Sequence, residues 1–189
     1  LPDLYVEISP VAKQENRFRV IVEDNGPGIV REQVPKIFGK LLYGSKFHKL
    51  SQSRGQQGMG ISAAGMYAQL TLGKPLHIIS RTKGDKLASE LHVSIDVARN
   101  KPDIHRKKQI EWDRPHGTRV AVEIEGRYQR GMHSVDMYLK QTAIANPHVS
   151  FHFQGPHGEV VDYTRSSSEL PPRPTEIKPH PRGVELGRL

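Results

Sequence analysis

The sequence contains no cysteine among its 189 residues. Without thiols, a disulfide scaffold, a cysteine-ligated zinc framework and a cysteine nucleophile are all excluded. No apolar run approaches the roughly 18–20 residues that a membrane-spanning helix needs, so we expect no membrane partner. Both absences fit a soluble protein of the reducing cytoplasm, which is where we expect this one to act.

The chain also lacks an initiator methionine, a signal peptide and a transit-like segment, and a strand pattern begins within a few residues of Leu1. We therefore interpret the sequence as a fragment or a processed chain. Its length suits one domain, in which about 70% of the unfolded surface can be buried.

Acidic residues are in the minority. The chain has 28 Lys and Arg against 20 Asp and Glu, which gives a net charge of +8 and favours a polyanionic partner. The charge is uneven, because residues 1–30 carry three basic and five acidic side chains whereas residues 31–54 carry six and one. The second region is therefore the expected place for a bound anion.

The hydrophobic patterns predict an α+β fold, with a mostly antiparallel sheet and helices on one face. Alternating patterns predict strands at residues 5–9, 17–23, 76–82, 87–96, 118–125, 149–153 and 159–163. Helical spacing predicts a short helix near residues 31–42 and longer helices at 61–72 and 134–145, the last with Ser134 as N-cap. Residues 44–58 have no apolar period and predict a long loop. The cluster Arg106-Lys107-Lys108 is interpreted as part of a solvated polar insertion between strands.

The first candidate motif is Asp24-x-Gly26-x-Gly28, which follows the second predicted strand. Asp-Asn-Gly is common in ordinary turns, so a purely structural role is one interpretation. In the functional interpretation, the two glycines let a flat base lie against bare main chain, while Asp24 accepts a hydrogen bond from an exocyclic amine.

The second motif is the glycine-rich run at residues 55–60 (GQQGMG), which leads into the helix at Ile61. Main-chain N–H groups at a helix start can bind phosphate, although neither the P-loop pattern nor the dinucleotide-binding pattern fits. A flexible connection is the alternative. The basic residues before it, Lys46, Lys49 and Arg54, favour polyphosphate.

The third motif is Gly117-Thr118 at the start of a strand. A lone Gly-Thr is usually structural. Here the Thr118 hydroxyl is also placed to bind a base directly or through an ordered water.

The order of these motifs, with a basic lid between the first two, resembles the GHKL ATPase superfamily of type II topoisomerases, MutL proteins, ninety-kilodalton heat-shock chaperones and sensor histidine kinases. More specific stretches resemble the B subunits of archaeal DNA topoisomerase VI over nearly the whole chain. These stretches are residues 44–50 (GSKFHKL), 53–64 (SRGQQGMGISAA), 130–131, 134–135, 138–140, 142–148 (TAIANPH) and 176–181 (EIKPHP).

This resemblance implies a Bergerat-type ATPase sandwich that binds ATP with Mg²⁺. The adenine amine would be bound by Asp24, with Gly26 and Gly28 close to the base and Thr118 supporting the same network. The implied lid residues are Ser45 and Lys46. The implied phosphate loop runs through Arg54, Gly55, Gln56, Gln57, Gly58, Met59, Gly60 and Ile61, where Lys46 and Arg54 add charge-assisted contacts.

The family's catalytic Glu and its Mg²⁺-ligating Asn lie on a helix before the first strand, so we expect both upstream of Leu1 and no catalytic or metal-ligating residue in this chain. Glu7 and Glu23, which lie on predicted strands, are not substitutes. A lysine that touches the terminal phosphate is expected beyond Leu189. We therefore predict that the parent protein hydrolyses ATP while residues 1–189 alone hydrolyse little or none.

The resemblance further implies a clamp in which ATP drives dimerisation of two B subunits, coupled to double-strand passage and relaxation of DNA by a topoisomerase VI A subunit. Double-stranded DNA would place the protein at the nucleoid. Residues 1–164 are predicted to form the ATP-binding domain, and residues 165–189 a Pro- and Ser-rich linker into a helical domain.

Three alternatives remain open. A nucleotide-switched scaffold, or another GHKL-type ATPase without topoisomerase activity, would share the site. A plain DNA-binding domain would bind DNA in a salt-sensitive manner that ATP and Asp24→Ala leave unchanged. Metal binding by histidine is not expected, since His148 and His152 on a strand would lie roughly 13 Å apart.

Overall fold

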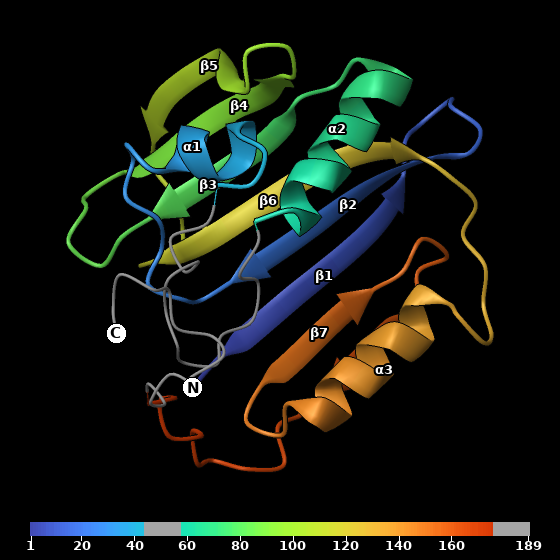
Figure 1. The fold of residues 1–189 in the computed structure, drawn as a ribbon. Helices are drawn as coiled ribbons and strands as arrows, with labels where there is room; N and C mark the ends of the chain where they lie inside the picture. Colours follow the sequence, from blue (N-terminus) through green and yellow to red (C-terminus); the bar gives the residue numbers. More distant parts are fainter. Residues whose placement is uncertain (44–57, 176–189) are drawn as a thin grey trace, which may run out of the picture.

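The computed structural model describes residues 1–43 and 58–175, which form one eight-stranded sheet and three α-helices (Figure 1). The strand order is β5-β4-β3-β6-β2-β1-β7-β8, and neighbours are antiparallel except β1 and β7, which are parallel. The strands are β1 (Asp3–Pro10), β2 (Arg17–Asp24), β3 (Leu76–Arg81), β4 (Ala88–Asp96), β5 (Lys101–Ile110), β6 (Gly117–Glu125), β7 (Ser150–Gln154) and β8 (Val160–Tyr163). The predicted fold class is confirmed.

All three helices lie on the same side of the sheet, which we call the helix face (Figure 1). They are α1 (Val34–Gly39), α2 (Gly60–Leu72) and α3 (Val135–Ala145). Two apolar clusters hold α1 and α3 against the sheet. One joins α1 to β3 and β4 through Phe38, Ile78 and Leu91, and the other joins α3 to β1 and β7 through Leu139 and Phe153.

Helix α2 packs closely because its buried residues are small: Ser62, Gly65 and Ala68. A Cβ at Gly65 would come 2.8 Å from Leu76 Cδ1, so a larger side chain would push the helix off the sheet. The helix ends where Gly73 adopts a left-handed conformation (φ 63°), which favours glycine.

Helix α3 begins with the predicted N-cap, since the Met137 N–H donates to Ser134 Oγ at 3.2 Å. Asp136, in the first turn, accepts a hydrogen bond from the Tyr128 hydroxyl. Burial, together with this hydrogen bond, raises the pKa of Tyr128. The hydrogen bond between Tyr128 and Asp136 ties the start of α3 to the segment that precedes it.

The interpretation of Arg106-Lys107-Lys108 as a solvated loop is wrong, because these residues lie in the middle of β5, which pairs with β4. The strand escaped prediction because nearly every residue in it is exposed, so no apolar side chain marks an inner face. Charged side chains on an edge strand also protect the sheet from pairing with another molecule.

The opposite face of the sheet, which we call the open face, carries no helix in the described residues (Figure 1). Its side chains are largely polar: Tyr5, Glu7, Glu23, His77, Glu90, His92, Arg119 and His152. None of the helices in the described part of the chain has the length and apolar character needed to cross a membrane.

Residues 165–175 follow β8 without helix or strand. The Arg165 guanidinium nevertheless donates to Asp3 Oδ1 and Ser150 Oγ, and the Ser166 and Ser167 amides donate to the Pro147 carbonyl. The start of this segment is therefore bound to the sheet, and the domain boundary at 164/165 stays a prediction.

Candidate nucleotide site

Strand β2 ends at Asp24, in the middle of the sheet, and the chain turns there through Asn25 and Gly26. The Gly26 N–H donates to Asp24 Oδ1 at 2.7 Å, and the Asp3 N–H donates to Asn25 Oδ1 at 2.9 Å. The first bond is the local turn chemistry of Asx residues, and the second ties the turn to the start of β1. Within the described residues, Asp24 Oδ2 accepts no hydrogen bond, so one charged oxygen stays available to a ligand.

Two glycines let this turn lie against the neighbouring strands. Gly28 has φ 74°, and a Cβ there would overlap the Arg81 carbonyl at the end of β3. Gly117 has φ 134°, and a Cβ there would overlap the Asp24 carbonyl. No other residue fits either position without backbone movement. The turn is therefore held by direct main-chain contacts with the end of β3 and the start of β6.

Thr118 lies beside Asp24 in the register of β2 and β6, and beside Ser80 in the register of β3 and β6. The hydroxyls of Ser80 and Thr118 are 3.0 Å apart, and both residues are buried. Ser80 Oγ also accepts the Ile29 N–H at 2.8 Å, just after the turn. Ser80 thus connects the turn to Thr118, although nothing in the sequence distinguished it within its strand.

A hollow of about 380 Å³ adjoins the turn on the helix face. Its walls come from the turn, the start of β1, α3 and β7, namely Pro2, Asp3, Leu4, Asp24, Asn25, Gly26, Thr142, Asn146, Val149 and Phe151. This size falls within the usual range for small-molecule pockets. The contribution of α3 and β7 was not predicted, because they lie more than 100 residues from Asp24 in the sequence.

Within residues 1–43 and 58–175, no side chain caps the start of α2. Met59 occupies the N-cap position without a side-chain hydrogen bond, and Gly60 is exposed, with no described atom within 4 Å of its missing Cβ. Gly58 has φ 66° and packs on the Tyr43 carbonyl, which fixes the approach to the helix. The first amides of α2, including that of Ile61, and the helix dipole favour an anion here.

Eight of the predicted binding residues therefore lie in the described part of the chain, as two groups. Asp24, Gly26, Gly28 and Thr118 are brought together where β2, β3 and β6 meet, whereas Gly58, Met59, Gly60 and Ile61 form the entry to α2. The other six, Ser45, Lys46, Arg54, Gly55, Gln56 and Gln57, lie outside the described residues.

Glu7 and Glu23 lie on the open face, away from the Asp24 carboxylate. Glu23 Oε1 is 2.7 Å from Arg114 Nε, and Glu23 Oε2 is 3.7 Å from Arg119 NH1. The hydrogen bond to Glu23 raises the pKa of the Arg114 guanidinium. A carboxylate held by two arginines on the other face is a poor general base for a ligand beside Asp24.

The model of the protein family described as "Histidine kinase-, DNA gyrase B-, and HSP90-like ATPase" matches residues 4–126, which include Asp24, Thr118 and the start of α2. The chain belongs to this ATPase family. Membership of this ATPase family implies nucleotide binding.

Three curated relatives, each named as the B subunit of a type 2 DNA topoisomerase 6, align with the whole chain. The identity is 52% for the Methanococcoides burtonii protein, 49% for that of Natronomonas pharaonis and 48% for that of Archaeoglobus fulgidus. The chain spans 30%, 23% and 31% of their respective lengths, less than a third in each case.

Among solved structures, the ATPase domain of the mismatch repair endonuclease MutL from Aquifex aeolicus superposes with a TM-score of 0.51 at 18% identity. The match covers 87% of this chain and 53% of that chain. At this identity the likeness concerns the fold alone, and it agrees with the family assignment.

The close approach at Gly28 yields a stability prediction. Gly28→Ala should destabilise the protein by about 1–3 kcal/mol, because the new methyl would overlap the Arg81 carbonyl in a backbone conformation that L-residues rarely adopt. Chemical denaturation measures the change. Gly126→Ala, whose Cβ would meet no atom within 4 Å, is the matched control and should change stability little. Equal effects of the two substitutions would contradict the account.

Proposed function

We propose that this chain is the ATP-binding part of the B subunit of a type IIB DNA topoisomerase. The observation that carries the proposal is the Asp24 turn, which borders a hollow and in which Asp24 Oδ2 accepts no hydrogen bond from a described residue. It stands in a chain that is 48–52% identical along its full length to three proteins named as such B subunits.

The adenine end of ATP fits the chemistry at Asp24. Asp24 Oδ1 is already bound to the Gly26 N–H, so Oδ2 is the atom that would accept from the adenine amine. Gly26 borders the hollow in which a flat ring would lie, and Gly28 holds the turn against the end of β3. Thr118, hydrogen-bonded to Ser80, would hold the ring edge or an ordered water.

The triphosphate would be bound at the uncapped start of α2. The amides from Gly58 to Ile61 and the helix dipole supply partial positive charge. We propose that Ser45, Lys46, Arg54, Gly55, Gln56 and Gln57 complete the phosphate site as lid and loop residues. Lys46 and Arg54 would add full charges to these contacts.

Water activation and Mg²⁺ binding would come from a Glu and an Asn on a helix that precedes β1. An exposed apolar residue supports such a helix: Val22, on the helix face of β2, is 40% exposed although its strand lies between β1 and β6. A helix packed there would cover Val22. On this proposal, Mg²⁺ supplies charge neutralisation for the phosphates, and residues 1–189 alone hydrolyse little ATP.

The implied partners follow from the same proposal. ATP binding would dimerise two B subunits, and a topoisomerase VI A subunit would cleave the double-stranded DNA that is passed. The net charge of +8 is consistent with a polyanionic partner, but it does not indicate which DNA topology the protein prefers.

Asp24→Asn tests the nucleotide site. The amide of the new side chain can still accept from the Gly26 N–H, but its NH₂ group would face the adenine amine, donor against donor. We expect the affinity for a non-hydrolysable ATP analogue to fall about 10–100-fold, the value of a hydrogen bond to a charged group. Calorimetry on the full-length protein measures it, with the exposed Asp103→Asn as control. Unchanged affinity in Asp24→Asn would refute the site.

A relaxation assay separates the topoisomerase proposal from its alternatives. The full-length protein, combined with its A subunit, should relax supercoiled DNA only when ATP is present, and Asp24→Asn should slow relaxation at limiting ATP. ATP binding without relaxation would favour a nucleotide-switched scaffold. DNA binding that depends on salt but ignores both ATP and Asp24 would favour a plain DNA-binding domain.

A further inference from the structure

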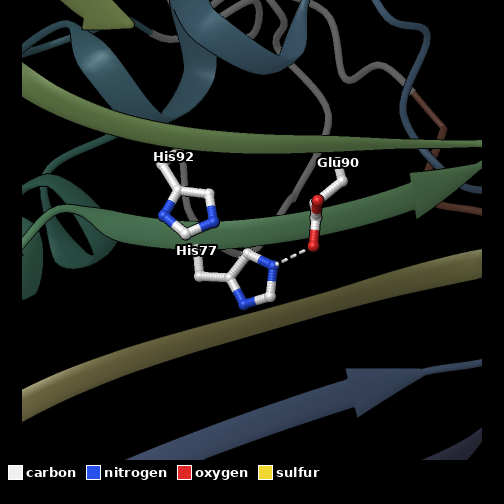
Figure 2. A group of neighbouring side chains, drawn as sticks. All are labelled: His77, Glu90 and His92. Carbon is white, nitrogen blue, oxygen red and sulfur yellow. Dashed lines mark hydrogen bonds and ion pairs between the residues drawn. The ribbon is translucent and has the colours of Figure 1, made fainter. Parts of the chain in front are cut away.

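Three potential metal ligands come together on the open face, on the opposite side of the sheet from the candidate nucleotide site. Figure 2 shows His77, on β3, beside Glu90 and His92, on β4. The register of the two strands places His77 directly opposite His92, and Glu90 precedes His92 by two residues on the same face. All three side chains are partly buried, so they are held by the sheet yet accessible from solvent.

The spacing of these groups is close to that of a coordination sphere. One ligand atom from each residue lies within 4.8 Å of the others, and His77 Nε2 is 2.9 Å from Glu90 Oε1. The two imidazole rings are 4.6 Å apart between centroids. Tetrahedral Zn²⁺, with bonds of about 2.0–2.2 Å, needs ligand atoms about 3.4 Å apart. Small side-chain rotations from the observed positions would meet that requirement.

We propose that His77, Glu90 and His92 form a site for a divalent transition-metal ion of the Zn²⁺ class. Two imidazoles and one carboxylate suit Zn²⁺ or Co²⁺ better than Mg²⁺ or Ca²⁺, which bind oxygen ligands. A hollow of about 190 Å³ borders His77 and His92 and leaves room for a fourth ligand, such as water. The site lies on the opposite face of the sheet from Asp24, and the proposal does not depend on the proposed function.

Two cationic side chains lie near Glu90 and compete with a metal ion for its carboxylate. Lys108 Nζ lies 3.0 Å from Glu90 Oε2, and Arg106 Nε lies 3.9 Å from the same oxygen. Both contacts involve Oε2, whereas His77 contacts Oε1. The metal can therefore take Oε1 while Lys108 holds the other oxygen and orients the carboxylate, as outer partners of metal ligands do.

The rival interpretation is an ion-pair and hydrogen-bond network without a metal. In that network His77 donates to Glu90, Glu90 is held by Lys108, and the His92 ring lies tilted against that of His77. Both interpretations predict that the three residues stabilise the sheet. Only the metal site predicts stoichiometric, saturable binding of a transition-metal ion.

The test is a titration of tag-free, chelator-treated full-length protein with Co²⁺, followed by its visible absorption, and then displacement by Zn²⁺. The wild-type protein should bind one equivalent through this cluster. His92→Gln and Glu90→Gln should each weaken binding at least about tenfold, because loss of even an outer partner of a ligand costs about 10–100-fold. His152→Gln is the matched control, since His152 lies on the same face but outside the cluster, where it pairs with Asp162 and stacks on Tyr5.

Thermal unfolding of the same proteins shows whether each variant is folded and whether Zn²⁺ stabilises it. Excess Zn²⁺ should raise the Tm of the wild-type and His152→Gln proteins and leave that of His92→Gln unchanged, because a ligand stabilises only the state that binds it. The absence of a Co²⁺ spectrum in the wild-type protein would overturn the proposal. So would equal Co²⁺ affinity in folded wild-type and His92→Gln proteins.

Discussion

The close contact between the turn after β2 and the ends of β3 and β6 is the constraint on which the site depends. The main chain at Gly28 packs on the Arg81 carbonyl, and the main chain at Gly117 packs on the Asp24 carbonyl, with no room for a Cβ in either place. Because these contacts are made by backbone, they fix the direction of Asp24 without using its side chain. One carboxylate oxygen then completes the turn, and the other accepts no hydrogen bond from the part of the chain that the structure describes.

The sheet separates two kinds of chemistry on its two faces. Alternation along β2 directs Asp24 to the helix face and Glu23 to the open face, where Arg114 and Arg119 bind it. The helix face offers a turn, a hollow and an uncapped helix start. The open face offers paired charges and the His77, Glu90 and His92 cluster. A ligand on one face can therefore bind without competing with a ligand on the other.

Local patterns in the sequence were sufficient to predict most elements and the residues at the turn. Asp24, Gly28 and Thr118 could be found because each belongs to a short motif next to a strand pattern. Strand β5 could not, since its exposed residues do not alternate in hydrophobicity. Ser80 was missed because it looks like any strand serine until β3 and β6 are paired. The metal-ligand cluster likewise depends on the register of β3 against β4.

The central claim is that the Asp24 carboxylate selects the base, and base discrimination tests it most directly. We would measure by calorimetry the affinities of the full-length protein for non-hydrolysable ATP and GTP analogues with Mg²⁺. The account predicts that the adenine nucleotide binds at least about tenfold more tightly, because guanine would present a carbonyl oxygen to the Asp24 carboxylate. It also predicts that Asp24→Asn removes this preference. Equal affinity of the wild-type protein for both nucleotides would contradict the account.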